Sequence, residues 1–160
     1  AFIGKVHDDF LGQEFTKDIG SAGIDFFTPP LKEGPMTGRS IVLVTPDAMR
    51  SMFTYLGANT YLSEDDIDEN IIKASRITYI EGYILDYDNG IKIAQKASEI
   101  AHKYNRQVAY TLSDISCIKG KEDVLLEFIK EHVDVLFANE NEIKEILKDK
   151  LEICKIKRYP

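Results

Sequence analysis

Three consecutive segments decide the fold: ITYIEGYIL (residues 77–85), GIKIAQKASEIAHKY (residues 90–104) and QVAYTL (residues 107–112). The outer two are rich in β-branched and aromatic residues, which is typical of strands. The middle segment repeats its apolar residues at helical spacing. A strand, a helix and a second strand in this order predict a βαβ unit with two parallel strands.

The same alternation continues toward the C-terminus. Residues 122–132 have the apolar spacing of a helix, residues 133–138 (VDVLFA) predict a strand, and residues 141–150 predict a further helix. The sequence therefore indicates an α/β protein whose parallel sheet is layered with helices.

A hairpin is predicted before this region. At residues 37–56 a β-branched run, a Pro46-Asp47 turn and a second, partly alternating run follow one another. The other elements expected in the N-terminal part are a strand at residues 2–6, a helix opened by Asp8-Asp9 and ended by Gly20–Gly23, a brief strand at residues 24–27, and a short helix that starts from a capping box at Ser63–Asp66 and runs through Ile72.

Composition narrows the functional classes. The chain has 160 residues with a formal net charge of −7, and an acidic chain without a basic stripe is a poor candidate for nucleic-acid binding. No targeting segment is visible, and no apolar run is long enough to span a bilayer. Cys117 and Cys154 are interpreted as reduced thiols of a cytoplasmic protein, although a disulfide between them stays open.

Polar residues follow the predicted strands where ligands bind in such folds. Ligands of open parallel sheets bind outside the carboxyl ends of the strands. The residues at those ends are His7-Asp8-Asp9, Glu81-Gly82, Ser113-Asp114 and Asn139–Glu142. We therefore expect the chemistry of the protein among them.

Several segments resemble one family in the right order. IGKVHDDFLG (residues 3–12) is similar to the G-x-V-G-D-D-x-x-G stretch of the PfkB, or ribokinase, family. TGRS (37–40), the hairpin and GAN (57–59) resemble the lid strands and the loop that follows them. IEGY (80–83) matches a strand-end acidic position, and NENE (139–142) fits the N-x-x-E motif. The segments TPDAMR (45–50) and TYLGA (54–58) look closest to adenosine-kinase-like bacterial sugar kinases.

The resemblance implies both a fold and a reaction. It implies a ribokinase-like three-layer α/β/α fold with a mostly parallel sheet and a small β lid, of which residues 1–160 would be the central portion of a single domain with a lid at about residues 24–58. It also implies transfer of the γ-phosphoryl group of ATP, with Mg²⁺, to a hydroxymethyl group of a sugar or nucleoside.

Three residues are expected on the substrate and nucleotide sides. By resemblance Glu81 orients the substrate, because a strand-end carboxylate accepts hydrogen bonds from sugar hydroxyls; the alternative is a solvated charge. Asn59 is expected on the substrate side, with an ordinary turn residue as the alternative. Asp114 resembles an acidic position near the nucleotide, and an aspartate that only stabilises a turn fits equally.

Asn139 and Glu142 lie one helical turn apart at the start of a helix. The resemblance implies that they present an amide and a carboxylate to hydrated Mg²⁺ and to nucleotide phosphates. Residues of these types also cap helix N-termini, and both roles are compatible.

The family's phosphate-binding machinery is not in this sequence. The family carries its catalytic base in a D-T-x-G-A-G-D stretch, yet no glycine follows Gly120 here, and no two glycines are adjacent as in its N-terminal substrate motif. We therefore expect a chain truncated at both ends, with an incomplete sheet, no catalytic residue of its own and no activity alone.

One alternative function stays open, and a second has less support. The chain could be a non-catalytic remnant that binds a sugar, a nucleoside or a partner, including a second copy of itself, through the lid or the open sheet edge. An unrelated Rossmann-like domain would need a G-x-G-x-x-G motif, which the sequence lacks.

Overall fold

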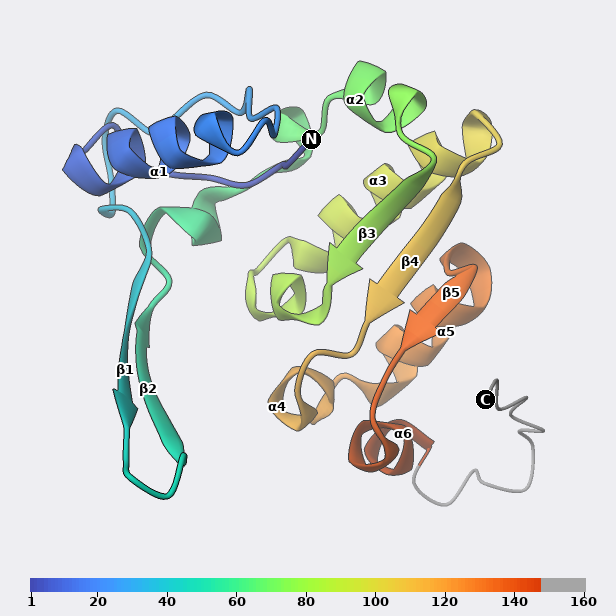
Figure 1. The fold of residues 1–160 in the computed structure, drawn as a ribbon. Coiled ribbons are helices and arrows are strands. Elements are labelled where there is room, and N and C mark those ends of the chain that lie inside the picture. Colours follow the sequence, from blue (N-terminus) through green and yellow to red (C-terminus); the bar gives the residue numbers. More distant parts are fainter. Residues whose placement is uncertain (148–160) are drawn as a thin grey trace. The chain divides into compact units, whose positions relative to one another are not determined.

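The computed structural model describes residues 1–147 and divides into two compact units. The first unit spans Ala1–Ile71 and the second begins at Ile72. Figure 1 shows a helix and a long hairpin in the first unit, and a parallel sheet with helices in the second. No helix among the described residues is long and apolar enough to cross a membrane.

Helix α1 (Phe10–Ser21) begins where Asp9 caps it. The Asp9 carboxylate accepts a hydrogen bond from the Gly12 amide at 2.8 Å, which satisfies one of the free N–H groups of the first turn. The helix ends before Gly23, whose φ of 75° suits glycine. The helix predicted after Asp8-Asp9 is therefore confirmed.

The extended segments around α1 are not regular strands. The strands predicted at residues 2–6 and 24–27 are wrong, because this part of the chain forms an isolated parallel bridge between His7 and Leu31 and a separate backbone hydrogen bond from Phe2 to Asp25, but no regular ladder. Pro29-Pro30, just before Leu31, has no N–H group to donate, so a continuous ladder cannot form there.

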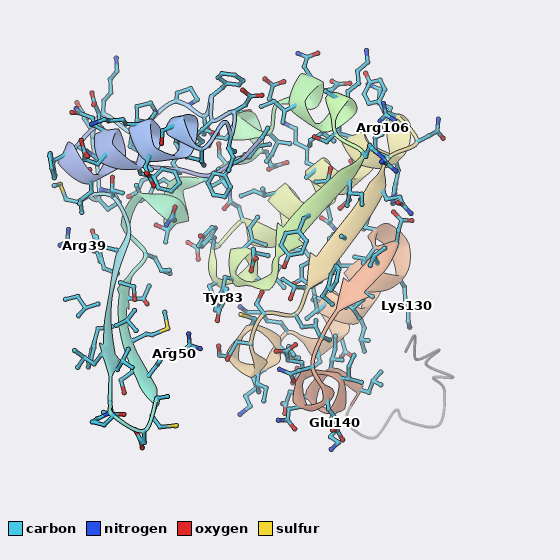
Figure 2. The ribbon with its side chains drawn as sticks, viewed as in Figure 1. Arg39, Arg50, Tyr83, Arg106, Lys130 and Glu140 are labelled. Atoms are coloured by element: carbon cyan, nitrogen blue, oxygen red, sulfur yellow. The ribbon has the colours of Figure 1, made fainter. Side chains whose placement is uncertain are left out.

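The predicted hairpin is confirmed. Strands β1 (Arg39–Val44) and β2 (Arg50–Tyr55) pair antiparallel. All residues of both strands are exposed, and Figure 2 shows side chains on both faces of the ribbon, with Arg39 and Arg50 labelled. The turn is closed by a hydrogen bond from the Thr45 amide to the Met49 carbonyl.

Three short helices follow the hairpin. They are η1 (Gly57–Tyr61), η2 (Glu64–Asp66) and α2 (Glu69–Ala74), which crosses the boundary between the units. The capping box between Ser63 and Asp66 is present. However, the single helix predicted from Ser63 through Ile72 is wrong, because Ile67 is extended and the Asp68 carboxylate accepts from the Asn70 amide, which starts a new N-terminus.

The sheet of the second unit is parallel, as predicted. It consists of β3 (Ile77–Glu81), β4 (Gln107–Thr111) and β5 (Val135–Phe137), in that spatial order. All three strands are shorter than predicted. The first ends at Glu81 because the 3₁₀ helix η3 (Gly82–Asp86) follows at once; a Cβ atom on Gly82 would lie 2.7 Å from the Leu112 carbonyl oxygen, so only glycine permits this approach.

Helices pack on this sheet and at the carboxyl ends of its strands. They are α3 (Gly90–Lys103), α4 (Ile115–Ile118), α5 (Glu122–His132) and α6 (Glu140–Leu147), of which the four-residue α4 was not predicted. Helix α3 packs on β3, β4 and α5. The Tyr110 and Phe128 rings meet edge-on at 5.4 Å and are fully buried. The predicted C-terminal helix, residues 141–150, is confirmed as far as Leu147; its last residues lie outside the described part.

Apolar side chains also line the opposite face of the sheet. Ile77, Tyr79 and Phe137 are each about half exposed, and the Tyr79 and Phe137 rings lie 6.1 Å apart. Cys117 is buried and free, and burial raises the pKa of its thiol to about 11, so it is not a reactive nucleophile. Cys154 lies outside the described residues.

Candidate active site at the strand ends

The carboxyl ends of β3, β4 and β5 meet at one edge of the second unit. The three arrows in Figure 1 point toward η3, α4 and the start of α6. Four of the predicted site residues lie there: Glu81, Asp114, Asn139 and Glu142. The structure thus brings them to the same edge of the sheet, whereas Asn59 belongs to the first unit.

Glu81 is held by the chain that follows β4. The Ser113 hydroxyl donates to Glu81 Oε2 at 3.1 Å and accepts from the Gly82 amide at 2.9 Å. Glu81 itself is exposed, and besides the bond from Ser113 it shares a side-chain hydrogen bond with the Tyr79 phenol. An exposed carboxylate offers more acceptor sites than these two bonds use, so it is suited to accept hydrogen bonds from hydroxyl groups of a ligand.

The edge is acidic. Burial raises the pKa of the Tyr83 phenol, and the negative charges of Asp114, Asp86 and Glu81 raise it further. Burial and the Glu81 charge likewise raise the pKa of Tyr79. Such an edge favours neutral hydroxyl groups and cations, and it disfavours phosphate unless a cation accompanies it.

Asp114 has the geometry of a helix cap. Its carboxylate accepts from the Ser116 amide at 2.7 Å, and hydrogen bonds with Ser116 hold the pKa of Asp114 below its ordinary value. The turn interpretation of Asp114 thus has direct structural support, while a role toward the nucleotide stays a prediction.

Asn139 and Glu142 hold each other. Glu142 Oε1 accepts from Asn139 Nδ2 at 2.7 Å, Glu142 Oε2 accepts from the Asn139 amide at 3.0 Å, and Asn139 Oδ1 accepts from the Glu142 amide at 2.9 Å. Glu142 is 6% exposed. The pair therefore forms a reciprocal cap at the N-terminus of α6.

The capping geometry also bears on Mg²⁺. Carboxylate and amide oxygens have the right chemistry for this ion, and Mg²⁺ usually keeps several of its waters. Because both Glu142 oxygens already accept a hydrogen bond, the pair fits an ion held through water better than one bound directly. No cluster of three metal-ligating side chains occurs within residues 1–147.

Asn59 lies at the base of the hairpin. It is in η1, and a Cβ atom on Gly38 would lie only 2.6 Å from the side-chain nitrogen Nδ2 of Asn59. Gly57, which starts η1, has a φ of 56°, and a Cβ there would lie 2.2 Å from the Met36 carbonyl oxygen. The GAN segment is thus a tight turn, as its residue types indicate, and a substrate role for Asn59 stays a prediction.

A second polar network at the base of the hairpin was not foreseen. Asp9 Oδ1 accepts from the Thr37 hydroxyl at 2.7 Å, and Oδ2 accepts from the Thr37 amide at 2.9 Å. Partial burial raises the pKa of Asp9, but the bonds from Thr37 and Gly12 and the nearby His7 ring outweigh it and lower that pKa to about 2. One carboxylate thus ties the start of α1 to the start of the hairpin.

Comparison with known proteins decides the family. The model of the pfkB family of carbohydrate kinases matches residues 1–158. The chain belongs to this family. The predicted family is therefore confirmed, and the TM-score of 0.86 to a solved adenosine kinase confirms the predicted ribokinase-like fold.

The pfkB chain resembles nucleoside kinases and sugar kinases alike. It is 40% identical to an adenosine kinase from Sinorhizobium meliloti, with a TM-score of 0.86. The match covers 91% of this chain and 45% of the adenosine kinase. A probable sugar kinase from Rhizobium etli is 35% identical, also with a TM-score of 0.86, over 91% of this chain and 44% of that one. The guanosine-inosine kinase of Escherichia coli K12 is 27% identical over 71% of this chain and 27% of its own length. The pfkB chain thus spans less than half the length of these relatives.

Proposed function

We propose that this chain carries the substrate side of an ATP-dependent kinase that phosphorylates a hydroxymethyl group of a sugar or nucleoside. The observation that carries the proposal is the Glu81 carboxylate, anchored through one oxygen at the carboxyl edge of a parallel sheet. The family supports phosphoryl transfer with ATP, and the names of its relatives support both substrate classes.

The reaction assigns a task to each group. The substrate hydroxyl oxygen bonds to the γ-phosphorus while the bond from that phosphorus to the β–γ bridging oxygen breaks, which leaves ADP and a phosphate ester. Glu81 would hold neighbouring hydroxyls of the substrate and orient the reacting one. Asn139 and Glu142 would hold Mg²⁺ through water, and that ion supplies charge neutralisation at the phosphates when bound.

The reaction also needs water to be excluded and the hydroxyl proton to be removed. The hairpin would act as the lid that excludes water. The proton of the hydroxyl needs a base that we do not find in these 160 residues, so we expect no turnover by this chain alone.

Two measurements on the 160-residue chain test this function. A coupled ATP assay with adenosine, D-ribose and D-fructose is expected to show no product, whereas a thermal-shift assay is expected to show stabilisation by at least one of them. Robust turnover would contradict the inference that these 160 residues lack the catalytic base. If no compound shifts the melting temperature, the substrate-binding proposal fails.

Glu81→Gln is expected to weaken binding of the active compound by about 10-fold to 100-fold, because a hydrogen bond to a charged acceptor contributes about 1.5–3 kcal/mol. Glu99→Gln, which removes an exposed charge from α3, is the matched control and should bind like the unmodified chain. Equal affinities for the two variants would remove Glu81 from the site.

The hairpin exposes more apolar surface than a lid requires. Ile41 and Phe53 are a cross-strand pair on one face, Val42 and Met52 are a pair on the other, and all four are 45–64% exposed. A lid over a small ligand needs one apolar face. We propose that the face with Val42 and Met52 pairs with another copy of this chain, since exposed apolar patches of this kind mark interaction surfaces.

Sedimentation velocity tests this pairing. The chain is expected to sediment as a concentration-dependent dimer, and Val42→Ser with Met52→Ser is expected to yield a monomer. The matched control, Ile41→Ser with Phe53→Ser, changes the opposite face. A monomer at all concentrations before mutation, or dissociation by both pairs of substitutions alike, would contradict a single dimerising face.

A further inference from the structure

Ser113 adopts a backbone conformation that serine rarely takes. Its φ is 64°, in the left-handed region that favours glycine. The turn around it is fixed on both sides, because the Leu112 amide donates to the Phe137 carbonyl at 3.0 Å and the Ser113 amide donates to Thr111 Oγ1 at 3.2 Å. Neighbouring strands therefore hold Ser113 in place despite the unfavourable conformation.

The strained backbone places the Ser113 hydroxyl between two strand ends. The hydroxyl accepts from the Gly82 amide at 2.9 Å and donates to Glu81 Oε2 at 3.1 Å. The Thr111 carbonyl, the alternative acceptor, is more distant at 3.5 Å. A charged acceptor forms the stronger hydrogen bond, so the hydroxyl proton is directed to Glu81.

A glycine would occupy this position without strain but would provide no hydroxyl. Glu81 is an exposed side chain with several rotatable bonds, and the Ser113 hydroxyl fixes it together with a side-chain hydrogen bond from Tyr79. Fixing one oxygen lowers the entropy that a ligand must remove when it orders the other.

We propose that Ser113 is a positioning residue that presents the Glu81 carboxylate to the hydroxyl groups of the substrate. The inference rests on the proposed function of Glu81 and adds the group through which that carboxylate is oriented. Ser113 itself touches no reacting atom in this account.

The test uses the 160-residue chain and NMR titrations with adenosine and with D-ribose. Ser113→Gly removes the hydroxyl and relieves the backbone, so the melting temperature is expected to stay or rise while affinity falls about tenfold. Asn105→Gly relieves the other positive φ that a non-glycine residue adopts in the described part of the second unit, at 55°, and should leave affinity unchanged. Ser113→Asn, which tolerates this conformation and carries an N–H donor, is expected to restore part of the affinity. If Ser113→Gly loosens the turn, Ser113→Ala, which also removes the hydroxyl, replaces it in the comparison with the unmodified chain.

A double-mutant cycle separates positioning from a merely structural role. In a Glu81→Gln background, Ser113→Gly is expected to have little further effect, because both substitutions remove the same oriented acceptor. Unchanged affinity in Ser113→Gly while Glu81→Gln weakens binding would overturn the role of Ser113 alone. Absence of binding by the unmodified chain, or normal binding by Glu81→Gln, would overturn the proposed function and this inference together.

Discussion

Asp9→Ala is expected to lower the free energy of unfolding of α1 and the hairpin base by about 3 kcal/mol, because three hydrogen bonds from Gly12 and Thr37 lose their acceptor. The loss is best measured as the opening free energy in amide hydrogen exchange of α1, which reports the first unit alone. Asp8→Ala is the matched control, since Asp8 Oδ1 accepts one exposed hydrogen bond from Gln13. Similar losses in both variants would show that the Asp9 network is not the main link.

The same carboxylate predicts a pH dependence. Because the pKa of Asp9 falls from 3.8 to about 2 on folding, its contribution is complete above about pH 5 and is lost progressively as the pH falls through 3.8 and then through about 2. The shift corresponds to about 2 kcal/mol. Asp9→Asn should therefore remove that part of the acid sensitivity of the α1 amides, and an unchanged profile would contradict the assignment.

Glu142→Ala is expected to destabilise the second unit by about 2–3 kcal/mol, because the Asn139 amide and Nδ2 groups lose their buried acceptors. Chemical denaturation followed by amide exchange in α6 measures the loss. Glu140→Ala, in the same turn, changes an exposed carboxylate that pairs with Lys144 and should cost less than about 0.5 kcal/mol. Equal losses would show that the reciprocal cap contributes little.

The parts of the fold that depend on local periodicity could be predicted from the sequence. Helix α3 and strand β4 follow directly from apolar spacing, and the hairpin follows from its turn and alternation. The strands expected at residues 2–6 and 24–27 failed because strand formation depends on a paired neighbour, and Pro29-Pro30 prevents pairing there. That information is not contained in the segments themselves.

The candidate site was predictable by position rather than by geometry. The predicted strand ends indicate Glu81, Ser113 and Asn139 from the sequence alone. However, the positive φ of Ser113 depends on its neighbouring strands. The Asp9–Thr37 network joins residues 28 positions apart, and nothing in the local sequence at either residue predicts that they are in contact.

The most direct test of the central claim is an amide NMR titration of the 160-residue chain with adenosine and with D-ribose. Glu81, anchored at the strand edge, is proposed to receive the substrate. We expect the largest shift changes at residues 81–83 and 113–114, and we expect these changes to disappear in Glu81→Gln. Shift changes confined to the first unit, or unchanged by that substitution, would contradict it.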